Sequence, residues 1–226
     1  MQEVIQFGPF IVKLKWLIIA VSGLLGYGVL KYRLKGTNYS KDIMLETFEK
    51  MFLMAIVVWK FSLILFSPIT VVTNPLALLY FSGGNRGALL ALAVLAIYLY
   101  HQTRKQQTSI WVYLDALAVG GLASLVLYHL LALVLKEPLV FHGTQSILSL
   151  LALFWLFKRS ETVGNPYHLN LVLLWYSLGQ IFISYITKSY GNFLGGFSKE
   201  QILFFTLAFI SLAIEWLKDL RTAKKA

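Results

Sequence analysis

The chain of 226 residues contains no cysteine, and only 13% of its residues are charged. Without cysteine, thiolate catalysis, iron–sulfur clusters and cysteine zinc sites are excluded. Soluble globular chains carry roughly 25% charged residues, whereas here hydrophobic residues make up 58% of the chain. So few charges cannot cover that much apolar side chain in water. The composition therefore indicates an integral membrane protein.

Seven apolar runs have the length and character of membrane-spanning helices, which need about 20 mostly apolar residues. They cover residues 12–31, 49–67, 76–100, 110–135, 143–158, 167–187 and 201–217. Turn signals such as Asn165-Pro166 separate the runs, and the repeated alternation of a membrane β-barrel is absent. We therefore expect an all-α integral membrane protein with seven transmembrane helices, in which residues 1–226 form a single transmembrane domain.

Most basic residues lie on one side of these predicted spans. Thirteen Lys and Arg residues, Arg33 among them, fall in the odd-numbered loops and the C-terminal tail, against five on the other side. Because cytoplasmic loops are enriched in Lys and Arg, we expect the N-terminus outside and the C-terminus in the cytoplasm. The net charge of +10 then reflects loops and contact with anionic lipid. No basic stripe stands apart from the spans, so we expect no nucleic-acid partner.

A set of basic and neutral polar side chains falls at one depth, in the outer half of the predicted membrane. The predicted headgroup-binding residues are Lys15, Lys60, Arg86, His129, His142, Gln145 and Gln180. Cations in hydrocarbon are costly and indicate function, although Lys60 could also snorkel to the interface. We expect no carboxylate in this layer, because Glu137 falls in an outer loop and Asp115 near an inner helix end. Such a layer suits an anionic phosphodiester headgroup, unless the groups point in different directions and never meet.

Metal and nucleotide sites have weaker signals. His129 and His142 share a side of the membrane and could join Glu137, but no local ligand spacing supports a metal site. The glycines of Gly83-Gly84-x-x-Gly87 open a membrane helix without a preceding strand, so they indicate close helix packing and not a phosphate loop. We predict no metal and no cofactor.

Short segments along the whole chain occur in a characteristic order. They are Phe7-Gly8-Pro9-Phe10, Lys60 with the run to Phe66, Asn74-Pro75-Leu76, Gly83-Gly84, Leu114-Asp115-Ala116-Leu117-Ala118, His142-Gly143-Thr144-Gln145, Tyr176-Ser177-Leu178-Gly179 and Ser198-x-x-Gln201. In this order the chain resembles the prolipoprotein diacylglyceryl transferases. The resemblance implies seven spans with the N-terminus outside, a bacterial cytoplasmic membrane, and transfer of diacylglycerol from phosphatidylglycerol to a lipobox cysteine.

The chain departs from this family at the residues that carry the chemistry. By spacing, the family's essential histidine falls on Ala88 and its signature arginine on His129. The arginine and glutamate of the sixth helix fall on Gln180 and Ser184, and the arginine of the second helix is Lys60. Losing arginines weakens bidentate phosphate binding, and losing the histidine removes the natural base. His129 is the only candidate base that remains, since imidazole titrates near neutral pH.

The sequence leaves three functions open. The first is a non-catalytic protein that handles an anionic lipid such as phosphatidylglycerol, or a lipoprotein or membrane-protein partner, in the outer half of the membrane. The second is an active, divergent diacylglyceryl or acyl transferase of lipoprotein maturation. The third is a structural or transport subunit, for which the glycine-rich residues 191–196 could be a docking edge.

Overall fold

The computed structural model describes residues 4–7, 10–35, 41–74, 78, 83–158, 163–187 and 196–223. The chain divides into two compact units. The first unit is Met1–Leu34 with Leu114–Ala226, and the second unit is Lys35–Tyr113. That residues 1–226 form a single transmembrane domain therefore stays a prediction.

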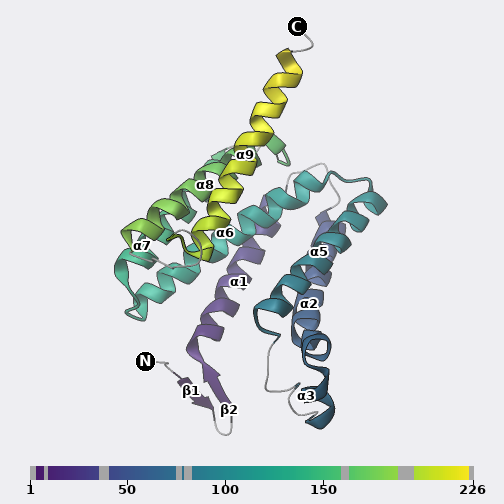
Figure 1. Cartoon of the computed structure of the whole chain (residues 1–226), viewed down its shortest axis with the longest axis vertical. Coiled ribbons are helices and arrows are strands. Elements are labelled where there is room, and N and C mark those ends of the chain that lie inside the picture. Colours follow the sequence, from purple (N-terminus) through teal and green to yellow (C-terminus); the bar gives the residue numbers. More distant parts are fainter. Residues whose placement is uncertain are drawn as a thin grey trace. The chain divides into compact units, whose positions relative to one another are not determined.

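The described residues are mainly helical, as expected. The helices are α1 Leu14–Arg33, α2 Lys41–Phe66, α3 Pro68–Thr73, α5 Gly84–Gln106, α6 Ile110–Val134, α7 Leu139–Lys158, α8 Pro166–Ile186 and α9 Lys199–Ala223 (Figure 1). Within the described part of the chain, five helices are long and apolar enough to cross a membrane: α1, α6, α7, α8 and the Lys199–Leu217 part of α9. Seven spans and their orientation stay predictions.

A short β-hairpin precedes α1 and was not expected from an all-α chain. Strand β1, Val4–Phe7, pairs antiparallel with β2, Phe10–Lys13, and Phe7 lies opposite Phe10 in the register. Both strands are rich in β-branched and aromatic residues, which favour extended structure. Because β2 takes up the apolar residues that we assigned to the start of the first span, that helix begins at Leu14 and not at residue 12.

Other helix bounds follow from local capping. The fourth and sixth spans were predicted to within one residue, and α8 begins where Asn165 caps its first turn by accepting a hydrogen bond from the Tyr167 amide at 3.0 Å. Helix α7 begins four residues earlier than predicted, at Leu139, because Pro138 suits a helix start. The predicted third span began at residue 76, and residues 75–77 and 79–82 lie outside the described residues, as do residues 191–195 of the proposed docking edge.

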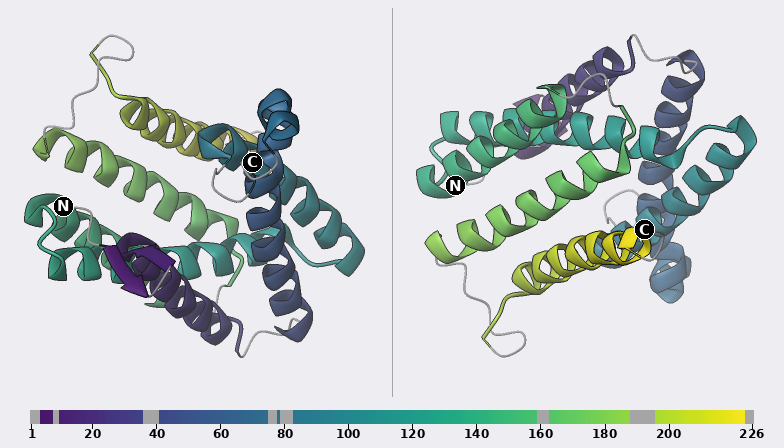
Figure 2. Two further views of the ribbon diagram at one scale, coloured as in Figure 1. Left: turned by 90° about the horizontal axis from the view of Figure 1, so that it is seen from below. Right: turned by 90° about the horizontal axis from the view of Figure 1, so that it is seen from above.

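The first unit is a layer of packed helices. Helix α8 lies between α7 and α9 (Figure 2), and buried Val119, Leu122 and Leu156 form its core with side chains of α1 and α8 around them. Helix α1 crosses α6 at Gly26, where an added Cβ would lie 1.9 Å from Ser124 Oγ and 2.4 Å from the Gly120 carbonyl oxygen. Such small residues let two helix backbones approach closely.

The second unit consists mainly of α2 packed along α5. An added Cβ at Gly87 of α5 would lie 2.2 Å from Ser62 Oγ of α2, and at Gly83 it would lie 2.1 Å from the Trp59 carbonyl oxygen. Trp59 Nε1 donates a hydrogen bond to the Gly84 carbonyl oxygen at 3.2 Å. The expectation that these glycines permit close helix packing is therefore confirmed for Gly83 and Gly87, whereas nothing lies within 4 Å of a Cβ added at Gly84.

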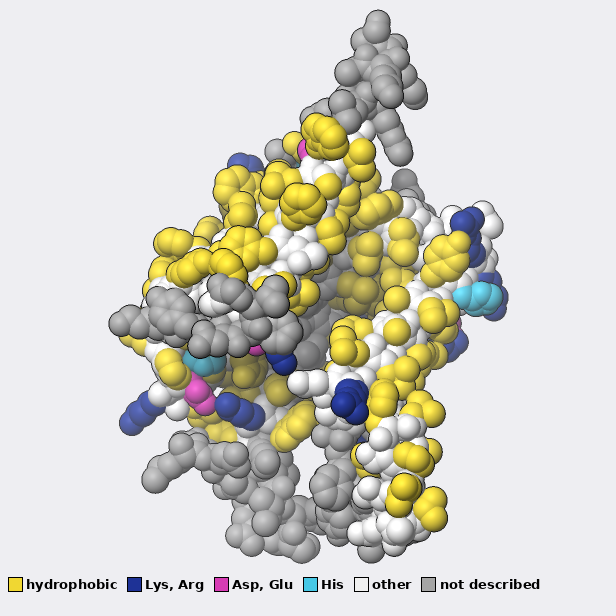
Figure 3. Space-filling view, in the orientation of Figure 1, with side chains coloured by type: hydrophobic (Ala, Val, Ile, Leu, Met, Phe, Trp, Pro, Cys, Tyr) yellow, Lys and Arg dark blue, Asp and Glu magenta, His cyan; other side chains and the backbone are white. Residues whose placement is uncertain are grey.

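Large apolar side chains are exposed along the helices. Figure 3 shows hydrophobic side chains over much of the visible face, and residues such as Leu24, Leu151 and Phe209 are each more than half exposed. Apolar surface of this extent marks a membrane or protein contact. Together with the helix lengths, it supports a multi-pass membrane protein.

Candidate functional site

The structure brings five of the seven predicted headgroup residues into one unit. Lys15, His129, His142, Gln145 and Gln180 belong to the first unit. The other two, Lys60 on α2 and Arg86 on α5, belong to the second unit. A site that joins all seven therefore stays a prediction.

A sharp turn between α6 and α7 places the two histidines together. Lys136 takes the left-handed conformation, with φ of 58°. The Lys136 amide donates to the Leu133 carbonyl oxygen at 3.0 Å, and the Glu137 amide donates to that of Ala132 at 3.1 Å. These two bonds form a Schellman motif, which ends a helix and reverses the chain. His129 near the end of α6 thereby faces His142 near the start of α7.

The two imidazoles form a buried pair. His129 Nδ1 and His142 Nδ1 lie 2.9 Å apart, and each residue is only 6% exposed. In a neutral pair one ring donates its Nδ1–H and the other accepts it. The rings of Tyr128 and Phe141 lie edge-on to the pair, against His129 and His142 respectively. The pair is therefore held in one arrangement by aromatic packing on both helices.

A carboxylate joins this layer, so the expectation that the layer has none is wrong. Glu137 Oε1 lies 3.4 Å from Lys15 Nζ, and its Oε2 lies 3.9 Å from His142 Nε2. The Schellman turn directs Glu137 back over the helix ends, an effect that membrane depth alone does not predict. The Lys15 side chain is 66% exposed, so its charge is both partly solvated and compensated. Lys15 is consequently a weaker anion ligand than the sequence suggested.

Gln145 and Gln180 bind each other across the contact of α7 with α8. Each Nε2 donates to the other's Oε1 at 2.7 Å, and both residues are more than nine-tenths buried. Sequence analysis predicted their depth, and the structure brings the two amides into direct contact. A carboxamide has two N–H donors and two acceptor sites. Each glutamine side chain therefore keeps one donor and one acceptor site that this pair does not use.

A second polar link ties α9 to α8. The Ser198 amide donates to Gln201 Oε1 at 2.8 Å, and the Gln201 amide donates to Ser198 Oγ at 3.1 Å. This reciprocal pair is a capping box, which fixes the start of α9. Gln201 Nε2 also donates to Ser184 Oγ at 3.0 Å. The Ser198-x-x-Gln201 segment noted in the sequence thus starts the last helix.

These polar groups surround a cavity of about 270 Å³ among α7, α8 and α9. Gln145, Gln180, Ser184 and Gln201 line it on the polar side. Apolar lining comes from Phe141, Ile183 and Phe204, and the lining also includes Thr187, Ser198 and Glu200. In the described part of the chain, no Lys, Arg or His belongs to this lining. Apart from the Glu200 carboxylate, the polar groups of the described lining are therefore neutral.

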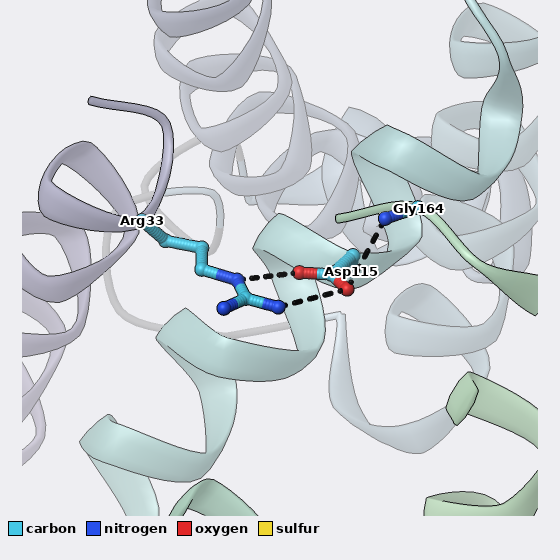
Figure 4. A network of polar contacts seen from close by, with 3 residues as sticks. All are labelled: Arg33, Asp115 and Gly164. Atoms are coloured by element: carbon cyan, nitrogen blue, oxygen red, sulfur yellow. Dashed lines mark hydrogen bonds and ion pairs between the residues drawn. The ribbon is translucent and has the colours of Figure 1, made fainter. Parts of the chain in front are cut away.

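A buried ion pair at the other end of α6 was missed by sequence analysis (Figure 4). Arg33 Nε lies 2.9 Å from Asp115 Oδ1, and Arg33 Nη2 donates to Asp115 Oδ2 at 3.3 Å. The Gly164 amide donates to the same Oδ2 at 3.3 Å. Each charged side chain is 2% exposed. Arg33, which we counted among the solvated loop cations, is instead the buried last residue of α1. The sequence did contain a signal for this pair, because the single Asp115 within an apolar run needs a partner of opposite charge.

The side chains of Glu137, His142 and His129 do not point toward one common position where a metal ion could bind. Glu137 approaches His142 Nε2, whereas His129 approaches the opposite ring nitrogen, Nδ1. Within the described residues, no group of three or more His, Cys, Asp and Glu side chains could hold a metal ion.

Comparison of the sequence with known protein families and with curated proteins finds no match. The resemblance to the diacylglyceryl transferases therefore rests on the sequence segments alone. Of those segments, Gly8-Pro9 and Pro75-Leu76 lie outside the described residues.

Proposed function

We propose that this chain is a multi-pass membrane protein that binds a membrane lipid, with the headgroup in the cavity among α7, α8 and α9, and does not transfer it. The observation that carries this proposal is the contact of Gln145 with Gln180 at the cavity wall. Both residues were predicted from the sequence to lie at headgroup depth. Binding sites for small ligands combine a concave, largely apolar wall with a few fixed polar groups, and this cavity has both.

The surroundings of the cavity suit a lipid better than a water-soluble ligand. Exposed apolar side chains such as Phe182 on α8 and Leu203 on α9 lie on the helices that form it. Acyl chains can pack against these faces while the headgroup occupies the polar wall. With the orientation predicted from the basic loops, the cavity lies in the outer half of a bacterial cytoplasmic membrane.

The residues at the positions where the diacylglyceryl transferases carry catalytic groups support lipid binding without transfer. Ala88 occupies the position of the family's histidine, and Gln180 and Ser184 occupy those of an arginine and a glutamate. Here Gln180 and Ser184 are committed to neutral hydrogen bonds, with Gln145 and Gln201 respectively. A scaffold of this kind retains the lipid site and lacks the groups that would activate a thiol. The lipid named by the resemblance, phosphatidylglycerol, is our first candidate ligand.

Lipid retention tests the proposal. The protein would be purified in nanodiscs that contain phosphatidylglycerol, and bound lipid would be counted by native mass spectrometry. We expect the double variant Gln145→Leu with Gln180→Leu to lose most of this lipid, because it removes the polar wall. Asn170→Leu is the matched control, since Asn170 is an amide on α8 whose bonds go to Ser211 and Glu215, away from the cavity. Equal retention by wild type and the double variant would refute the proposal.

One observation favours a second candidate, an active diacylglyceryl or acyl transferase. Glu137, His142 and His129 form a carboxylate–imidazole–imidazole series, with separations of 3.9 Å and 2.9 Å. A base that is oriented by a second group is the arrangement that activates nucleophiles. The test is transfer from phosphatidylglycerol to a lipobox peptide, detected as a mass increase on its cysteine. Transfer that His129→Ala abolishes would establish this function, and no transfer beside an active control enzyme would exclude it.

A further inference from the structure

We infer that the cavity among α7, α8 and α9 recognises the alcohol hydroxyls of a lipid headgroup and not its charge. This inference rests on the proposed function, because it assigns a ligand class to the same cavity. It goes further by predicting that an uncharged glycolipid binds there as well as an anionic glycerol-bearing phospholipid does.

The first argument is the count of unused hydrogen-bonding capacity. Gln145 and Gln180 each use one N–H and one oxygen lone pair in their reciprocal bonds. Gln201 likewise donates once, to Ser184, and accepts once, from the Ser198 amide. Among the described residues, three carboxamides at one cavity therefore each keep an unused donor and an unused acceptor. An alcohol hydroxyl both donates and accepts, so neighbouring hydroxyls match neighbouring carboxamides.

The second argument is the charge of the lining. No cation belongs to the described lining, whereas Glu200 contributes a carboxylate. A phosphate placed there would find no ionic partner in the described lining and would face the carboxylate of Glu200, which is unfavourable. Lys15, the lysine of the predicted layer in this unit, is compensated by Glu137. An uncharged hydroxyl group meets neither cost, and a phosphodiester can remain outside the cavity.

The third argument is size. The cavity volume of about 270 Å³ lies just below the roughly 300–1,000 Å³ of typical small-molecule sites. It has room for a glycerol or one sugar ring. The ligand class is therefore a diacyl lipid with a small headgroup that carries neighbouring alcohols.

Four lipids separate hydroxyl recognition from charge recognition. Phosphatidylglycerol has both alcohols and charge, glucosyl diacylglycerol has alcohols only, phosphatidic acid has charge only, and phosphatidylcholine has neither. Each lipid would compete with a fluorescent phosphatidylglycerol for the wild-type protein in nanodiscs. We expect both alcohol-bearing lipids to compete about tenfold better than the other two, since two extra hydrogen bonds of ~0.7 kcal/mol each amount to tenfold.

Variants of the lining residues test whether the preference for alcohol-bearing lipids arises in this cavity. Gln145→Leu with Gln180→Leu should abolish the tenfold preference, and Asn170→Leu should leave it intact. Thr187→Val keeps the side-chain volume and removes one lining hydroxyl, so we expect a loss of about twofold to fivefold for alcohol-bearing lipids only. Thermal unfolding checks that each protein is folded. If the double variant is not folded, the single variants Gln180→Leu and Thr187→Val provide the test in its place.

The outcomes distinguish this inference from the proposed function. If phosphatidic acid competes as well as phosphatidylglycerol, or glucosyl diacylglycerol fails to compete, hydroxyl recognition is refuted while lipid binding stands. If no lipid competes better than phosphatidylcholine, the proposed function itself fails. A preference that survives the glutamine and threonine substitutions would also refute the assignment to this cavity.

Discussion

The two ends of α6 hold polar groups inside apolar surroundings in opposite ways. Near its start, Asp115 is fully engaged by Arg33 and by the Gly164 amide. Near its other end, His129 pairs with His142, and the amide pair of Gln145 with Gln180 follows one turn along α7. The first group is charged and enclosed, and the second is neutral and borders a cavity. The contrast indicates that the first end holds the fold and that the second end retains capacity for a ligand.

The strongest test of this contrast is Asp115→Asn. The substitution leaves Arg33 buried beside a neutral group, so we expect the free energy of unfolding in detergent to fall by about 3–5 kcal/mol. The double variant Asp115→Leu with Arg33→Leu removes both charges and should recover most of this loss. A cost below about 1 kcal/mol for Asp115→Asn would contradict a structural role for the ion pair.

The crossing of α1 over α6, between these two ends, gives the next effect. Gly26→Ala places a Cβ against Ser124 and the Gly120 carbonyl oxygen, and overpacking of this kind costs about 1–3 kcal/mol. Gly23→Ala is the matched control, because nothing lies within 4 Å of its added Cβ. Chemical unfolding of both proteins in the same detergent measures the difference. Equal stability of the two variants would show that the crossing is loose.

The amide pair should lose less stability than the ion pair when one partner is removed. Gln180→Leu leaves one buried carboxamide without its partner, which costs about 1–3 kcal/mol. Adding Gln145→Leu should bring the total loss below about 1 kcal/mol, because replacing both partners by apolar groups is nearly neutral. Thermal unfolding of the single and double variants measures this recovery. A double variant as unstable as Asp115→Asn would mean that this end also holds the fold.

A smaller effect is expected at the exposed pair of Lys15 with Glu137. Glu137→Gln removes one charge from a pair that is one-third or more exposed, so the loss of stability should stay below about 1 kcal/mol. It should shrink further in 0.5 M salt, which screens such pairs. A loss that is larger and independent of salt would indicate that Glu137 acts through His142 instead.

The smallest effect concerns the two cations of the second unit. Lys60→Gln with Arg86→Gln should change the competition of glucosyl diacylglycerol and phosphatidylglycerol by less than about threefold, equivalent to ~0.65 kcal/mol, because neither residue lines the cavity. The competition assay with four lipids measures both. A selective loss of the anionic lipids would restore the phosphate-binding interpretation of the polar layer.

Sequence analysis predicted some helices closely and the contacts between helices poorly. The second span was expected to begin at residue 49, whereas α2 begins at Lys41, and the third was expected to end at residue 100, whereas α5 ends at Gln106. The fourth and sixth spans were located to within a residue, because turn signals bound their apolar runs. Depth placed Gln145 and Gln180 at one level, but their facing one another depends on helix rotation, which depth does not give. Glu137 was placed in a loop, and only the left-handed Lys136 turn explains its return toward His142. Arg33 looked like a solvated loop cation because its partner is 82 residues away.

That separation has a consequence for how the protein is made. Arg33 and Asp115 are 82 residues apart, and chains are synthesised at about 5–20 residues per second. The carboxylate of Asp115 is therefore synthesised roughly 4 to 16 s after the guanidinium with which it pairs. We expect the burial of Arg33 in this ion pair to be a late step of biogenesis, completed only after the start of α6 has been made.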